Sequence, residues 1–394
     1  MSNTVIRSAA SSLMNGQKYV QINTNAWGWA DQIIFSKHEK LLSQGVDSYV
    51  IWGRGRSPKN DHEFRLLKYP ELKYPEYISA AVATRFDGKF GFHSVGPTRR
   101  LLNILDQIRP DVVHLHSLLD YFVNVEMLFE WLARSNCHVL WTLHDCWAFT
   151  GYCMHFTYVG CEQWKTSCTN NCPCLPPDRY PELRLRSKVG WCFERKSKIF
   201  TMLPPERLTL ITPSKWLAEL TRTSFLAKYP VTVVHNKIDK NIFKPTVTNF
   251  RTKYHMGNRF IVLGVASHWG VRKGYEDMLR LAKELGPHFA VVLVGLEQNQ
   301  IQTLPTDTSA LLVGIGKTSS REELVGIYTA VDVLMNPTKE DNYPTVNLEA
   351  EACGTPVITY DVGGCAETIS LNESRVVKGY TEALEAITTM SMNI

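Results

Sequence analysis

The 394-residue sequence is longer than one ordinary hydrophobic core supports, so we expect two domains. Apolar residues make up 44% and charged residues 21%, near the averages for globular proteins, which excludes a disordered, collagen-like or coiled-coil chain. Residues 1–16 hold no signal-peptide core and no stretch approaches the ~20 apolar residues of a membrane span, so we expect a cytoplasmic protein, with peripheral attachment to the inner face of the cytoplasmic membrane left open.

The formal net charge of +5 is unevenly distributed. Residues 251–394 carry 12 Lys+Arg and 17 Asp+Glu, a net charge of −5, which leaves +10 for residues 1–250. A basic half favours an anionic membrane surface or a phosphorylated substrate, although random drift of surface charge is the alternative. Scattered basic residues without a nucleic-acid motif argue against a nucleic-acid partner.

The first half alternates β-branched runs with amphipathic stretches, which is typical of parallel βα units. We expect strands over residues 18–24, 47–51, 111–116, 138–143, 208–212 and 231–235. Helices are expected over residues 32–44, 101–109, 125–135 and 215–226.

Residues 236–247 (NKIDKNIFKPTV) are expected to form a linker, after which the pattern restarts. Further strands are predicted over residues 259–265, 289–294, 310–313, 333–335 and 356–359, and helices over 274–285, 321–330, 346–353 and 381–390. We therefore predict an α/β protein with two doubly wound Rossmann-like domains, residues 1–236 and 237–394, facing across a central cleft. Ligands of such sheets bind outside the carboxyl ends of the strands, so the cleft is the expected site.

The strongest chemical signal is the segment 338–356 (TKEDNYPTVNLEAEACGTP). Asp341 follows a predicted strand, a short loop comes next, and Glu349 lies in the first turns of the following helix. Backbone N–H groups at that helix N-terminus favour phosphate. Glu349 is suited to accept hydrogen bonds from two adjacent sugar hydroxyls.

This segment resembles the acidic-loop-acidic signature of the retaining, GT-B-fold family-four glycosyltransferases. The family usually has two glutamates separated by seven residues, and here Asp341 takes the first position and Glu349 the second. The resemblance implies that the second acid binds the nucleotide ribose and that the first acid and its loop face the donor sugar. That loop comprises Asn342, Tyr343, Pro344 and Thr345.

Two further segments resemble the donor side of the family. In residues 264–274 (GVASHWGVRKG), Lys273 matches the lysine that grips the donor diphosphate. The family's usual arginine position is occupied by His268, and Arg272 is the expected substitute, with a solvated surface charge as the alternative. Ile315, in the Val-Gly-Ile-Gly run 313–316, resembles the loop whose backbone contacts the nucleobase.

In the first half, residues 141–151 (WTLHDCWAFTG) resemble the capsule and exopolysaccharide branch of the same family. The resemblance implies that His144 contacts the donor and positions the reacting groups, with Asp145 beside it. His114 and His116 are candidates for the acceptor side or for ordinary core histidines. Gly28 stands where the family has a glycine-rich turn near the diphosphate.

Ten cysteines in a chain expected to be cytoplasmic argue against a disulfide framework. Cys153, Cys161, Cys168 and Cys172 are candidates for a structural zinc site within a cysteine-rich insertion at about residues 151–180. Ordinary thiols or an occasional disulfide are the alternatives. No cofactor is expected for catalysis, and no cysteine is expected to act as a nucleophile.

Residues 181–208 are basic and contain an apolar helical face, from Val189 and Cys192 to Phe200 and Leu203. This pattern predicts either an interfacial helix lying on anionic lipid or an ordinary helix packed on its own sheet.

The resemblance implies a hexosyltransferase that moves a sugar from a UDP- or GDP-linked donor to a glycan or polyprenyl-linked acceptor, with retention and without a metal, in cell-surface polysaccharide biosynthesis. The first domain would take the acceptor and the second the donor. Two alternatives remain: a nucleotide-sugar 2-epimerase of the same architecture, and an inactive scaffold in a polysaccharide assembly complex. A dinucleotide oxidoreductase is disfavoured because no Gly-x-Gly-x-x-Gly run follows a strand. The family's last helix normally crosses back onto the first domain, and that crossover is expected to be short or missing.

Overall fold

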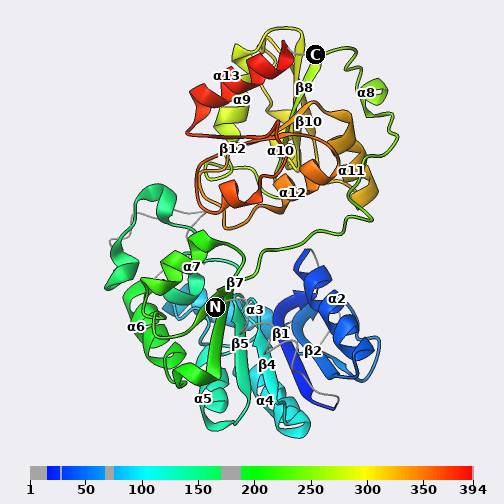
Figure 1. Ribbon diagram of the computed structural model, residues 1–394. Coiled ribbons are helices and arrows are strands. Elements are labelled where there is room, and N and C mark those ends of the chain that lie inside the picture. Colours follow the sequence, from blue (N-terminus) through cyan, green and yellow to red (C-terminus); the bar gives the residue numbers. More distant parts are fainter. Residues whose placement is uncertain (1–15, 27–28, 67–74, 170–187, 393–394) are drawn as a thin grey trace. The chain divides into compact units, whose positions relative to one another are not determined.

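The computed structural model describes residues 16–26, 29–66, 75–169 and 188–392. The chain divides into two compact units, Met1–Val234 and His235–Ile394, which are described separately (Figure 1). No helix in the described ranges is long and apolar enough to cross a bilayer.

The first unit contains a seven-stranded sheet in the order β3-β2-β1-β4-β5-β6-β7, with every neighbouring pair parallel. Its strands are β1 (Lys18–Ala26), β2 (Asp47–Gly55), β3 (Glu63–Arg65), β4 (Val112–Leu115), β5 (His138–Thr142), β6 (Leu208–Thr212) and β7 (Val231–Val233). Its α-helices are α2 (Trp29–Ser43), α3 (Pro75–Asp87), α4 (Val95–Ile108), α5 (Val125–Arg134), α6 (Val189–Phe200) and α7 (Lys215–Arg222). Single-turn 3₁₀ segments include η1 (Trp147–Phe149).

The second unit contains a six-stranded sheet in the order β10-β9-β8-β11-β12-β13, again with parallel neighbours. Its strands are β8 (Phe260–Val265), β9 (Phe289–Val294), β10 (Leu311–Ile315), β11 (Val333–Asn336), β12 (Val357–Tyr360) and β13 (Arg375–Val377). Its α-helices are α8 (Phe250–Lys253), α9 (Tyr275–Glu284), α10 (Gln298–Gln302), α11 (Arg321–Ala330), α12 (Thr345–Ala352) and α13 (Tyr380–Ser391).

Both sheets are covered on two faces, which explains the near-continuous apolar runs of their central strands. On β8, Val262 belongs to one core cluster, whereas Ile261 and Leu263 belong to the cluster on the other face. On β4, Val113 belongs to the core cluster on one face of the sheet and Val112 to the cluster on the other face. The sequence order of the strands reverses between β1 and β4 in one sheet and between β8 and β11 in the other. Each unit is therefore a doubly wound α/β sheet with one topological switch point, as the sequence predicted.

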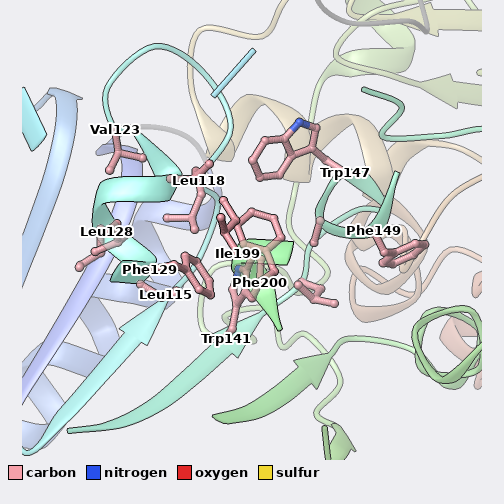
Figure 2. Close-up of a cluster of buried hydrophobic side chains, with 14 of the residues drawn as sticks. Leu115, Leu118, Val123, Leu128, Phe129, Trp141, Trp147, Phe149, Ile199 and Phe200 are labelled. Atoms are coloured by element: carbon pink, nitrogen blue, oxygen red, sulfur yellow. The ribbon is translucent and has the colours of Figure 1, made fainter. Parts of the chain in front are cut away.

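The main core of the first unit lies where β4, β5, α5 and α6 meet (Figure 2). The rings of Phe129, Trp141 and Phe200 lie within 5.3 Å of one another, centroid to centroid. The apolar face of α6 is thus buried in the unit's own core, where Val189, Cys192 and Phe200 lie. Of the two alternatives for this basic segment, the described part of it favours the packed helix over the interfacial one, and residues 181–187 lie outside the described ranges.

Candidate functional site

The two loops at the switch point of the second sheet are bound to each other. Gly274, at the end of the β8–α9 loop, adopts φ +71°, and a Cβ there would fall 2.8 Å from Pro337 Cβ and nearer still to its carbonyl oxygen. This close approach allows the Lys339 N–H to donate to the Arg272 carbonyl at 2.7 Å. A residue without a side chain is therefore required where the loops meet.

This junction brings three predicted donor residues together. Lys273 Nζ lies 2.5 Å from Asp341 Oδ2, and both side chains are only 18–19% exposed. The Arg272 guanidinium donates from Nη1 to the Glu340 carbonyl at 2.8 Å, so it lies against the loop that carries Asp341. On the other side, the Gly364 N–H donates to the Asp341 carbonyl at 3.0 Å. The site holds a largely buried cation and a largely buried carboxylate, and the backbone that carries the carboxylate is hydrogen-bonded on both sides.

The loop then enters α12 at Pro344, which provides no side-chain cap for the first turn. The N–H groups of that turn are thus not occupied by a capping side chain, and the helix dipole favours an anion beside them. Tyr343 is turned toward its own unit, where its hydroxyl shares a hydrogen bond of 2.9 Å with His235 Nδ1. Asn342, Tyr343 and Pro344 are buried, and Thr345 is partly exposed.

Glu349 lies one turn further along α12. The Tyr328 hydroxyl donates to its carboxylate at 3.0 Å. Burial raises the pKa of Glu349 above its usual value, and hydrogen bonds from Tyr328 and Thr345 oppose that shift. Sequence reasoning missed Tyr328 and His235, because each reaches its partner only through the tertiary fold.

Ile315 ends β10, two strands away from β8. Its carbonyl accepts from the N–H groups of Gly295 at 3.0 Å and Leu296 at 3.1 Å, so this oxygen is already engaged by the protein. His268 is exposed, and its Nε2 lies 3.8 Å from a Glu297 carboxylate oxygen.

In the first unit, three histidines form a ladder at the carboxyl ends of β4 and β5. The ring centroids of His114 and His116 are 4.1 Å apart, and those of His116 and His144 are 5.8 Å apart with nearly parallel planes. Burial lowers the pKa of His144 to about 4 and takes those of His114 and His116 well below their usual value. All three rings are therefore neutral at physiological pH.

The hydrogen bonds of His114 fix its tautomer. Lys37 Nζ, which can only donate, lies 3.2 Å from Nδ1, and the Tyr19 hydroxyl lies 2.8 Å from the same atom. The Nε2 atom must then carry the proton, and it lies 2.8 Å from Thr142 Oγ1. Both ring nitrogens are thus used within the unit, which favours the core-histidine alternative for His114. Burial lowers the pKa of Lys37 to about 8.

A small hollow in the first unit is lined by three of the other candidates. Its walls come from the ends of β4 and β5 and the loops that follow, including His116, His144 and Asp145. The Asp145 carboxylate accepts from the Trp147 N–H at 2.8 Å, and burial raises its pKa. His116 Nε2 lies 3.3 Å from Gln21 Oε1.

A buried lysine that sequence reasoning missed supports this loop. Lys196 of α6 is 0% exposed, donates from Nζ to the Trp147 carbonyl at 2.6 Å and lies 4.1 Å from the centre of the Trp147 ring. Burial lowers its pKa to about 8. In the sequence it is one of the basic residues of the segment 181–208, and nothing marks it as buried.

Two candidates fall outside the described residues: Gly28 and Cys172. Cys153, Cys161 and Cys168 are buried. Within the ranges that the structure covers, no group of three or more His, Cys, Asp or Glu side chains is arranged to hold a metal ion. The zinc prediction needs Cys172 and remains a prediction.

Comparison with known proteins gives a consistent result for both units. Residues 34–241, more than half of the chain, match the family model described as Glycosyltransferase Family 4, and residues 247–390 match Glycosyl transferases group 1. A curated relative, the putative colanic acid biosynthesis glycosyl transferase WcaC of Escherichia coli K12, is 23% identical over 89% of this chain and 85% of its own length.

Among solved structures, sucrose-phosphate synthase from Thermosynechococcus elongatus superposes with a TM-score of 0.67 at 16% identity, covering 96% of this chain and 90% of that one. Anabaena HepE in complex with UDP and glucose gives a TM-score of 0.59 at 14% identity, covering 95% and 89%. These likenesses confirm the GT-B fold class predicted from the sequence.

Proposed function

The chain belongs to glycosyltransferase family 4, and from that premise we propose that it transfers a hexosyl group from a UDP- or GDP-linked sugar to a hydroxyl of a lipid-linked glycan during cell-surface polysaccharide synthesis. The observation that carries the proposal is the Lys273–Asp341 pair at the switch point of the second sheet, beside an α12 N-terminus that has no side-chain cap. The assignment of WcaC to colanic acid biosynthesis and the UDP bound to HepE support the choice of pathway and donor class.

Binding of the donor diphosphate would separate the Lys273–Asp341 ion pair. In the structure Lys273 neutralises Asp341 at 2.5 Å. A diphosphate beside α12 would attract Lys273 and leave Asp341 to accept hydrogen bonds from sugar hydroxyls. Charge that develops on the leaving diphosphate would be stabilised by the ammonium and the first-turn N–H groups without reorganisation of the backbone.

The carboxylate of Glu349 is suited to bind the ribose hydroxyls of the donor. Its carboxylate is held by Tyr328 in a partly desolvated site, where a hydrogen bond from a hydroxyl gains strength. A ribose offers two adjacent hydroxyls to the two oxygens of one carboxylate. Burial raises the Glu349 pKa, and hydroxyl donors would favour the ionised form.

The transfer itself is proposed to proceed with retention and without a metal. The acceptor hydroxyl attacks the anomeric carbon on the face from which the diphosphate departs. The bond from that carbon to the phosphate oxygen breaks, and this oxygen takes the hydroxyl proton. His144, neutral because its pKa falls to about 4, would orient the reacting groups through hydrogen bonds rather than through charge.

The proposal is tested first by thermal-shift titration with UDP, GDP and CMP and their common sugars. We expect one nucleotide to stabilise the protein by about 2.7 kcal/mol when present at a hundredfold excess over its Kd. Glu349→Gln should abolish most of this stabilisation. Glu385→Gln, an exposed acid on α13, is the matched control and should retain it.

Product analysis tests the chemistry. Proton NMR of the product should show the anomeric configuration of the donor, and activity should persist in EDTA. An inverted product would contradict the retaining mechanism, whereas a folded protein that binds no nucleotide would support the scaffold alternative.

A further inference from the structure

Helix α3 of the first unit, which the sequence did not predict, presents an apolar stripe to solvent. Ile78, Val82 and Phe86 recur every four residues and are 48%, 45% and 59% exposed. The opposite face of the helix is buried through Ala80, Ala81 and Thr84. Side chains four residues apart share one face of a helix, so the three large residues form a continuous strip.

The start of α4 lies beside α3 and adds a further exposed apolar residue. Val95 is 40% exposed, and a hollow of about 340 Å³ is lined by α3 residues, among them Ser79, and by Val95 and its neighbours, which brings the two helices together. Large apolar side chains concentrated in this way are unusual on a solvent-facing surface and mark an interaction site.

Arginines lie on the same faces as the apolar residues. Arg85 follows Val82 by three positions, and Arg99 follows Val95 by four. Both are exposed, and neither forms an ion pair in the described part of the chain. The acids nearby are compensated, since Glu76 pairs with Arg100 at 2.5 Å and Asp87 lies 3.0 Å from His93 and 4.0 Å from Lys89. The surface therefore combines exposed apolar groups with uncompensated positive charge.

We propose that this surface, formed by Ile78, Val82, Arg85, Phe86, Val95 and Arg99, docks the first unit on an anionic lipid bilayer. The apolar side chains would enter the headgroup–acyl boundary, while each arginine lays its stem along the apolar strip and directs its guanidinium to lipid phosphate. Charge complementarity selects a bilayer with anionic lipids over a neutral one.

The hollow between the helices is not a phosphate site. Glu76 lies on its wall and would repel an anion, even with Arg100 beside it. The proposal therefore rests on the strip and its two arginines, and the bilayer is bound through many weak contacts rather than one headgroup pocket.

The test is co-flotation of the full chain with vesicles of phosphatidylcholine alone and of phosphatidylcholine mixed with phosphatidylglycerol, without donor or acceptor. The wild type should float with the mixed vesicles and much less with the neutral ones. Ile78→Ser/Val82→Ser/Phe86→Ser should reduce the partition coefficient about tenfold or more on mixed vesicles. Arg85→Gln/Arg99→Gln should reduce it about fivefold per arginine on mixed vesicles and leave neutral vesicles unaffected.

The matched control is Val247→Ser/Val376→Ser, two exposed valines elsewhere in the chain, which should float like the wild type. Far-UV circular dichroism and the thermal unfolding midpoint without ligand establish that each variant is folded. The arginine variant still tests the proposal if the serine variant is unstable. Failure of the wild type to float with mixed vesicles overturns the proposal, as does a serine variant that floats unchanged. If light scattering shows a wild-type dimer that the serine variant dissolves, while neither protein floats, the surface binds a second copy instead. Because no sugar transfer is measured, these outcomes are independent of the proposed enzymatic function.

Discussion

Replacement of Gly274 by alanine should damage the proposed donor site through the backbone alone. The position has φ +71°, a conformation that costs an ordinary residue about 1–2 kcal/mol. The new Cβ would also lie 2.8 Å from Pro337 Cβ and Cγ, so the two loops must separate, at a further cost of about 1–3 kcal/mol. The sum, about 2–5 kcal/mol, is a large fraction of the stability of a domain of this size.

The experiment compares Gly274→Ala with Gly270→Ala in the same β8–α9 loop. Gly270 has no neighbouring atom within 4 Å of an added Cβ and no positive φ, so its variant should behave as the wild type. For Gly274→Ala we expect Tm to fall by at least about 4 °C, since each kcal/mol lowers Tm by about 2–4 °C. Isothermal titration should show weaker nucleotide binding as well, because Lys273 and Asp341 lie on the separated loops. Equal Tm and equal affinity for the two variants would refute the claim that loop closure at Gly274 builds the site.

Three further outcomes are expected. Tyr328→Phe removes the hydroxyl that donates to Glu349 at 3.0 Å and should weaken nucleotide binding about tenfold by calorimetry, with unchanged affinity as the contrary result. The pKa of His144 falls from 6.5 to about 4 on folding, so the unfolded chain binds more protons than the folded one between these pH values. The free energy of unfolding should therefore decrease as the pH is lowered through this window. In His144→Gln the urea-denaturation midpoint should depend less steeply on pH, and an equally steep dependence would count against the buried neutral ring. If the insertion holds zinc, mass spectrometry of the purified protein should find about one zinc per chain and Cys168→Ser should lose it, whereas a metal-free wild type would leave ordinary thiols.

The convergence of Lys273 and Asp341 was largely predictable from the sequence. Lys273 and Asp341 each follow a strand, and β8 and β11 are neighbours at the switch point. Parallel strands end at the same edge, so two loops recognised separately had to converge there. Motif spacing and sheet topology were sufficient to predict which residues meet, although not that the lysine and the aspartate pair directly.

The supporting contacts were not accessible, because they depend on distances across the fold. Tyr328 reaches Glu349 from a different helix, and His235 reaches Tyr343 from the chain segment that precedes the second sheet. Nothing in the local pattern of hydrophobicity marks a tyrosine whose ring packs in the core while its hydroxyl finds a carboxylate. The exposed strip on α3 was missed because no helix was predicted over residues 75–87, and an apolar helical face would in any case ordinarily predict burial.

Lys196 shows how a polar residue can mislead a reading by periodicity. A helical pattern counts lysine as solvated, yet here its ammonium is compensated by the Trp147 carbonyl and ring in a site with no exposure. The contact ties the segment 141–151 to the core. Trp147 and Phe149 belong to the core cluster of Figure 2, and Trp147 also lines the hollow together with His144 and Asp145. Because Lys196 binds the Trp147 carbonyl, two residues after Asp145, the aromatic part of the segment anchors the loop that presents the histidine and the aspartate.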